Sequence, residues 1–125
     1  MPDNPFRIFE DFKNNGIVYF MECKGFIKIG RCKYLNLDYR RGELQGGNPF
    51  DLEVLGIIIC ESESGARGKE RDLQKRFADF KHRNEWFRKE PELLDYITEH
   101  AEDAEPCLDM SREYANTRQR EQYDR

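Results

Sequence analysis

A carboxylate stands within the apolar stripe of a predicted helix and is the first candidate for chemistry. The helix is expected from Ser62 or Ser64 to about Phe80, and Glu70 falls on its apolar side. The apolar residues at helical spacing are Ala66, Leu73, Phe77 and Phe80. A carboxylate on a buried face is costly unless a cation or hydrogen bonds compensate it. Glu70 is therefore a candidate cation ligand, and a structural ion pair to an arginine is the alternative.

A tyrosine and a lysine come together in a predicted β-hairpin over residues 16–30. Lys24-Gly25 fits a two-residue turn, because glycine readily supplies a positive φ. This turn places Tyr19 opposite Gly30 and makes Tyr19 and Lys28 diagonal neighbours on one face. The other face is wholly apolar and should lie on a core; it carries Val18, Phe20, Ile27 and Ile29. The hairpin thus predicts a phenol beside an ammonium group.

The elements that must position these side chains predict an α+β fold. Asn36 is expected to cap a helix from Leu37 to Gln45, which the segment Gly46-Gly47-Asn48-Pro49 ends. The nearly continuous apolar run 52–60 is expected to be a central strand covered on both sides. The prediction is a three-stranded antiparallel sheet, formed by the hairpin and this strand and flanked by helices.

The chain divides into a main domain with extensions at each end. The predicted divisions are an N-terminal extension at 1–14, the domain at 15–90, a helix at 91–104, and a charged tail at 105–125, either a frayed helix or disordered. Glu85-Trp86-Phe87 reads as a short packed segment, and Trp86 is interpreted as a core residue rather than a base-stacking platform. Pro91 opens the C-terminal helix.

The charge distribution is compatible with contact to nucleic acid. The net charge of the 125 residues is −4, but residues 15–88 carry +3 and residues 89–125 carry −6. Four scattered cysteines without a CxxC pair argue against a zinc site and against a disulfide framework. The sequence has no apolar run of the length of a membrane span and no signal-peptide pattern. We therefore expect no membrane contact and a cytoplasmic location, the host cytoplasm for a phage-encoded chain.

The ordered set of motifs resembles the GIY-YIG nuclease superfamily, in particular its phage and bacterial branch with K-I-G as the second motif. The motifs, which span about residues 15–90, are GIVY at Gly16 to Tyr19, KIG at Lys28 to Gly30, RRGELQGGNP at Arg40 to Pro49, the helix around Glu70, and EWF at Glu85 to Phe87. The chain departs from the superfamily in three ways. Lys28 replaces the second tyrosine, Gln74 stands where branch members often carry histidine, and the hairpin is short.

The resemblance implies hydrolysis of a nucleic-acid phosphodiester, with DNA as the first expectation. It implies one divalent cation, Mg²⁺ or another such as Mn²⁺, held by Glu70 and water. Tyr19 would act as general base or orient the attacking water, and Lys28 would favour its phenolate. Arg40 would hold the scissile phosphate. Further contacts to nucleic acid are expected from Arg31, Lys33, Arg41 and Asn48.

Two alternatives to a metal-dependent endonuclease remain open from the sequence. One is a weak or inactive module that binds nucleic acid on the same scaffold. The other is a protein-interaction role for the acidic C-terminal region after Pro91. The sequence leans towards an enzyme, because Tyr19, Arg40 and Glu70 all remain chemically competent. It leaves the oligomeric state open.

Overall fold

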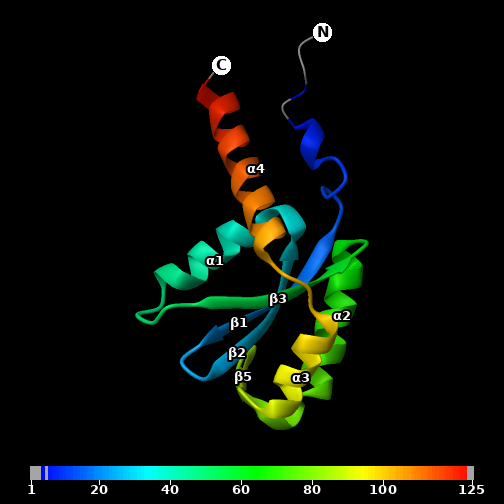
Figure 1. The fold of residues 1–125 in the computed structure, drawn as a ribbon, viewed down its shortest axis with the longest axis vertical. Coiled ribbons are helices and arrows are strands. Elements are labelled where there is room, and N and C mark those ends of the chain that lie inside the picture. Colours follow the sequence, from blue (N-terminus) through cyan, green and yellow to red (C-terminus); the bar gives the residue numbers. More distant parts are fainter. Residues whose placement is uncertain (1–3, 5, 124–125) are drawn as a thin grey trace.

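The chain folds into a five-stranded antiparallel sheet with helices on both faces (Figure 1). The computed structural model describes residue 4 and residues 6–123. The strand order is β3-β1-β2-β5-β4. The strands are β1 (Gly16–Cys23), β2 (Phe26–Lys33), β3 (Glu53–Cys60), β4 (Lys81–Arg83) and β5 (Trp86–Arg88), and the α-helices are α1 (Leu37–Gly46), α2 (Glu63–Arg76), α3 (Pro91–His100) and α4 (Glu105–Tyr123).

The predicted hairpin is confirmed in its turn and in its register. Lys24 and Gly25 have φ values of 53° and 86°, and positive φ at both turn residues matches the right-handed twist of the strands. Tyr19 lies opposite Gly30, and Met21 lies opposite Lys28. The second strand extends to Lys33, beyond the predicted end at residue 30. The register therefore sends alternate side chains to the two faces as expected.

Each face of the sheet has its own apolar core. One core packs α2 and α3 against the apolar hairpin face that the sequence predicted, with Val18, Phe20, Ile27 and Ile29 all buried. The other core contains Tyr19 and Met21 and is covered by residues of α1 and α4, including Leu37 and Leu108. Figure 1 shows α2 and α3 on the side of the sheet away from α1 and α4. The face carrying Tyr19 is the one that bears the candidate site.

The α+β class is confirmed, but the prediction of a three-stranded sheet with residues 52–60 at its centre is wrong. The sheet has five strands, and β3 is an edge strand: it pairs with β1 on one side, and on the other it makes an isolated bridge from Ile57 to Glu102. Ile59 is 36% exposed on that edge, and Glu53 is also exposed. A continuous apolar run does not reveal which neighbours a strand has. The strands β4 and β5 have three residues each, too few to show a period of two.

Residues 105–123, predicted as a frayed helix or a disordered tail, form the long helix α4. Cys107, Leu108 and Ser111 are buried there, so the first half of α4 packs as part of the domain. Ser111 Oγ accepts a hydrogen bond from the backbone N–H of Asp38 at 3.0 Å, near the start of α1. The predicted cap of α1, Asn36, precedes the helix but makes no capping hydrogen bond through its side chain.

The start of α2 is confirmed, because Ser62 caps the helix by accepting the backbone N–H of Gly65 at 3.0 Å. The helix ends at Arg76, and a 3₁₀ turn, Ala78–Phe80, continues to the predicted end. Over the part of the chain that the structure describes, no helix is both long and apolar enough to cross a membrane.

Candidate active site at the open edge of β2

The ring of Tyr19 lies directly over Gly30 on the neighbouring strand. A Cβ atom built on Gly30 would lie 2.4 Å from both Cζ and Oη of Tyr19, so only glycine leaves room for the ring. Tyr19 is 1% exposed, and its burial raises the pKa of the phenol well above 10.0. Its hydroxyl forms no hydrogen bond with another described residue, and with the whole residue 1% exposed the oxygen has little contact with solvent.

Next to Gly30 the edge of β2 is open, because β5 pairs only with Phe26 to Lys28. Beyond that point, the backbone N–H of Ile29 donates to the carbonyl of Glu85 at 3.1 Å. Gln74 of α2 donates from Nε2 to the carbonyl of Ile29, also at 3.1 Å. These bonds bring α2 and the β4–β5 turn to the strand edge, where their side chains reach the face that carries Tyr19.

Two carboxylates from these elements meet at the edge. Glu70 has a side chain only 15% exposed, and burial first and the charge of Glu85 second raise the pKa of its carboxyl. Arg31 and Lys28 act in the opposite direction on the same pKa. Arg31 Nε lies 3.7 Å from Glu70 Oε1, which is an ion pair but too long for a hydrogen bond. The ionised form of Glu70 is thus only partly compensated.

Arg40 of α1 supplies positive charge near Tyr19. Its guanidinium is the group that lowers the pKa of the Tyr19 phenol and of the Cys32 thiol, against the larger effect of burial. Its Nε atom is buried without a hydrogen-bond partner among the described residues. The carboxylate that pairs with it is Glu43, whose Oε1 lies 3.7 Å from Nε. With 41% of its side chain exposed and only this long ion pair to Glu43, the Arg40 guanidinium is a candidate ligand for an anion.

The four predicted catalytic residues therefore lie in one cluster. Tyr19 interacts electrostatically with Arg40 and Glu70. Lys28 does not act on the pKa of Tyr19; its Nζ lies 2.9 Å from Glu85 Oε2 instead. The role of Lys28 beside the Tyr19 phenol therefore stays a prediction, and in the structure the lysine pairs with a carboxylate in the β4–β5 turn.

The four predicted contacts to nucleic acid have different surroundings. Arg31 joins the cluster through Glu70, and Lys33 is exposed at the end of β2. Arg41 is bound to Asp38 at 3.1 Å and borders a hollow between β3 and α4. The Asn48 side chain is used in the packing of its loop: its Nδ2 donates to Cys23 Sγ at the end of β1 at 3.2 Å, and its Oδ1 accepts the Phe50 N–H at 2.9 Å. Only Arg31 lies with the four catalytic candidates.

Sequence reasoning gave no role to Glu85 or to Cys32. Glu85 acts on both Tyr19 and Glu70, and Cys32 is a buried thiol near Tyr19 and Arg40. The sequence shows Glu85 as a carboxylate next to Trp86. Spacing along the chain does not reveal which groups this carboxylate contacts. Cys32 follows Gly30 by two residues and so shares its face, which a period-two reading could have found.

A divalent cation fits these residues as a sparse site. Within residue 4 and residues 6–123, no group of three or more His, Cys, Asp or Glu side chains could hold a metal. The donors at hand are the carboxylates of Glu70 and Glu85, whose mutual repulsion a cation would relieve. Mg²⁺ is commonly held by one or two carboxylates together with water and substrate phosphate. Mg²⁺ at Glu70 remains a prediction.

Fold and site define a small α+β domain with a charged cluster at a strand edge. Residues 16–108 match the T5orf172 domain, and the chain belongs to this family. The GIY-YIG assignment made from the motifs is wrong, since the matching model is that of a different family and no GIY-YIG model matches. No curated protein and no solved structure matches the chain. The T5orf172 domain is associated with nuclease-like and DNA-binding proteins, which supports a role connected with nucleic acid.

Proposed function

We propose that the chain hydrolyses phosphodiester bonds in nucleic acid, with DNA as the first substrate to test, at the open edge of β2. The observation that carries this proposal is the meeting of three groups at one place. These are the guanidinium of Arg40, the hydroxyl of Tyr19, and the partly compensated carboxylate of Glu70. Hydrolysis of a phosphodiester needs a positioned water and cationic stabilisation of the charge that develops on phosphorus.

Tyr19 orients the attacking water and does not serve as a strong base. Its raised pKa keeps the phenol protonated at neutral pH, whereas an effective general base has a pKa near the working pH. A protonated hydroxyl can still accept a hydrogen bond from water and donate one to a phosphate oxygen. The packing against Gly30 holds the ring and its hydroxyl in place. This arrangement supports a positioning role for the phenol.

Arg40 binds the scissile phosphate, and the carboxylates would hold the cation. The planar guanidinium suits a phosphate, its side chain is 41% exposed, and its 3.7 Å ion pair with Glu43 is too long to be a hydrogen bond. Glu70 would be the main ligand of this cation. Glu85, whose Oε2 lies 2.9 Å from Lys28 Nζ, would be the second. When bound, a divalent cation polarises a phosphoryl oxygen and stabilises the leaving oxygen.

The Arg31–Glu70 ion pair favours a second candidate function, in which the chain binds nucleic acid without cutting it. In that case Glu70 serves only to hold Arg31 on β2 at 3.7 Å. Binding through phosphates would still weaken steeply with salt. The two functions differ in the effect expected when the carboxylate of Glu70 is neutralised.

A plasmid-nicking assay with Mg²⁺ separates these functions. Tyr19→Phe, Arg40→Ala and Glu70→Gln should each lower the nicking rate, by on the order of 10²–10³ for the loss of the phosphate ligand. Asp72→Asn, an exposed carboxylate on the same helix as Glu70, is the matched control and should leave the rate unchanged. EDTA should abolish nicking.

Equal residual nicking in the wild type, Glu70→Gln and Tyr19→Phe would identify a contaminating nuclease and remove the hydrolase proposal. Salt-sensitive binding by a wild-type protein that does not nick would leave the binding function. Affinity that is unchanged between low and moderate salt would count against phosphate contacts altogether.

A further inference from the structure

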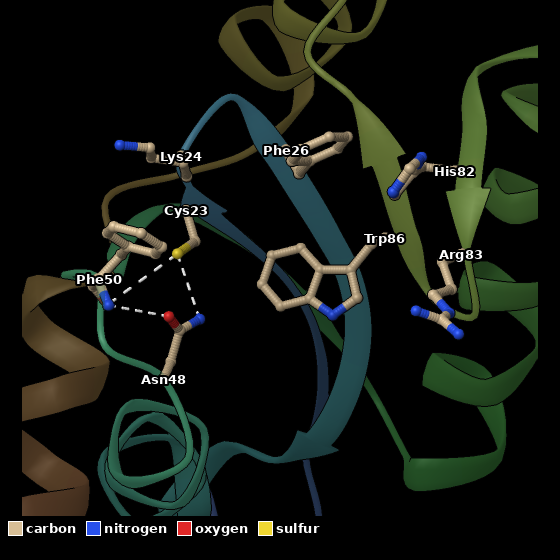
Figure 2. Close-up of a pocket in the computed structure, with 8 residues that line it drawn as sticks. All are labelled: Cys23, Lys24, Phe26, Asn48, Phe50, His82, Arg83 and Trp86. Carbon is tan, nitrogen blue, oxygen red and sulfur yellow. Dashed lines mark hydrogen bonds between the residues drawn. The ribbon is translucent and has the colours of Figure 1, made fainter.

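A hollow of about 300 Å³ lies on the face of the sheet that carries Tyr19, near the candidate active site. Its aromatic lining comes from Phe26, Phe50, His82 and Trp86, drawn from β2, the loop after α1, β4 and β5 (Figure 2). Phe50 is 46% exposed, and Trp86 and Phe26 are half-buried. The interpretation of Trp86 as a core residue is therefore wrong, whereas Phe87 beside it is fully buried.

The aromatic rings are arranged around an open space. The rings of Phe26 and His82 have centroids 4.5 Å apart at an interplanar angle of 31°. In Figure 2, the indole of Trp86 projects between the loop that carries Phe50 and the strand that carries His82. The Asn48 amide accepts the Phe50 N–H at 2.9 Å and so holds this loop at the mouth of the hollow. Flat apolar surfaces on several sides suit a flat ligand.

The rim of the hollow is positively charged. Lys24 Nζ lies 4.4 Å from the centroid of the Phe50 ring, and Arg83 stands at the opposite side (Figure 2). None of the described residues that line the hollow is Asp or Glu. A ligand that combines a flat ring with negative charge would match both the walls and the rim.

Lys28 connects this hollow to the phosphodiester site. It pairs across the sheet with Trp86, its Nζ lies 5.6 Å from the centroid of that ring, and the same Nζ is bound to Glu85. Gly30, under the Tyr19 ring, follows Lys28 by two residues on β2, a separation of about 7 Å along a strand. A nucleic-acid strand held at the active site would thus pass directly by the hollow.

We propose that this hollow binds an unstacked nucleobase of the strand whose backbone lies at the Tyr19 site. The proposal rests on the nucleic-acid contact of the proposed function. It adds that the preferred ligand is a single strand or a duplex with an unpaired base. The amide of Asn48 is occupied within its loop, so the walls offer stacking surfaces without a free amide to read a base edge. Such stacking tolerates any base sequence.

The experiment uses Trp86 as the reporter, since it is the single tryptophan of the chain. The full chain in EDTA is titrated with a single-stranded oligothymidylate and with an abasic oligonucleotide of the same length. Anisotropy of an end label measures binding, and intrinsic fluorescence measures stacking. The base-containing strand should quench Trp86 and bind at least about fivefold tighter than the abasic strand, the lower end of the usual effect of base stacking.

Phe50→Ala should remove most of that fivefold advantage while leaving affinity for the abasic strand unchanged, and Phe50 is exposed enough for the variant to fold. Tyr39→Ala, an aromatic residue 63% exposed outside the hollow, is the matched control and should preserve the ratio of the two affinities.

Equal binding and equal quenching by the two strands would overturn the nucleobase site and leave the nucleic-acid contact standing. A Phe50→Ala variant that loses affinity equally for both strands would overturn it as well, because the residue would then not act through the base. Failure of both strands to bind would overturn this inference, whereas the plasmid-nicking assay would still decide the proposed function.

Discussion

The packing of Tyr19 on Gly30 makes a single methyl group a sharp probe of the candidate site. In Gly30→Ala, the new Cβ would lie 2.4 Å from Cζ and Oη of Tyr19, and an ordinary contact needs at least 3.4 Å. The ring must therefore retreat by about 1 Å, and it is buried with little space to move into. A displacement of this size in a reacting group can cost on the order of 100-fold in rate.

The same substitution should destabilise the fold, since inserting a methyl group into a packed core costs about 1–3 kcal/mol. Two other glycines separate this cost from the effect on the site. Gly56→Ala would bring its Cβ to 2.9 Å from the Ala101 Cβ, on β3 and so on the other side of β1 from Gly30, and should cost stability without lowering the nicking rate. Gly42→Ala on α1 meets nothing within 4 Å and should stabilise the helix by about 0.5–1 kcal/mol.

Urea unfolding and plasmid nicking, measured on all three variants, test this reasoning. In a Tyr19→Phe background, Gly30→Ala should still cost stability, because Cζ remains, but should lower nicking no further. Wild-type nicking by a folded Gly30→Ala protein would refute the claim that this contact positions the phenol. An equal loss of nicking in Gly56→Ala would show that stability alone explains the effect.

Three further predictions concern stability. Ser111→Ala should cost about 1–3 kcal/mol in urea unfolding, because the Asp38 N–H loses its partner; an unchanged midpoint would contradict this. Ser62→Ala should cost about 1 kcal/mol and lower the helical signal of α2 on heating, whereas an equal midpoint would show that the cap is replaced by water. Burial raises the pKa of the Cys32 and Cys107 thiols from 9.0 to about 12. The stability that the protonated thiols contribute is therefore complete below pH 9 and is lost as the pH rises towards 12. The free energy of unfolding should therefore fall over that window, and Cys107→Ala should reduce the slope by up to about 1.4 kcal/mol per pH unit; an equal slope would contradict the shift.

The sequence predicted the parts of the site that depend on local geometry. A two-residue turn at Lys24-Gly25 determines the pairing of its strands, so Tyr19 opposite Gly30 followed from the turn alone. Helical spacing likewise placed Glu70 on the packed side of α2, where it is half-buried. The motif set, by contrast, pointed to the wrong family, because short strings of residues recur in more than one family.

Which charges meet could not be read from the sequence. Lys28 has Tyr19 within reach on its own hairpin, yet it binds Glu85 from a turn more than fifty residues further along the chain. The position of β3 at the edge and the pairing of β5 with β2 likewise depend on how distant segments pack. Trp86 is the clearest case, since its own sequence neighbourhood is that of a core strand, and only the loop around Phe50 makes it the wall of a hollow.

What the sequence determined by itself is thus the hairpin, its register, and the side of each element on which the reactive groups stand, because turns and periodicity act within a few residues. What only the tertiary structure decided is the cluster at the edge of β2. There the pairing of β5 with β2 ends at Lys28, and α2 and the β4–β5 turn bind the next residue of β2 through hydrogen bonds. The physical reason is that electrostatic pairing and burial depend on distance in space, which local spacing along the chain does not determine.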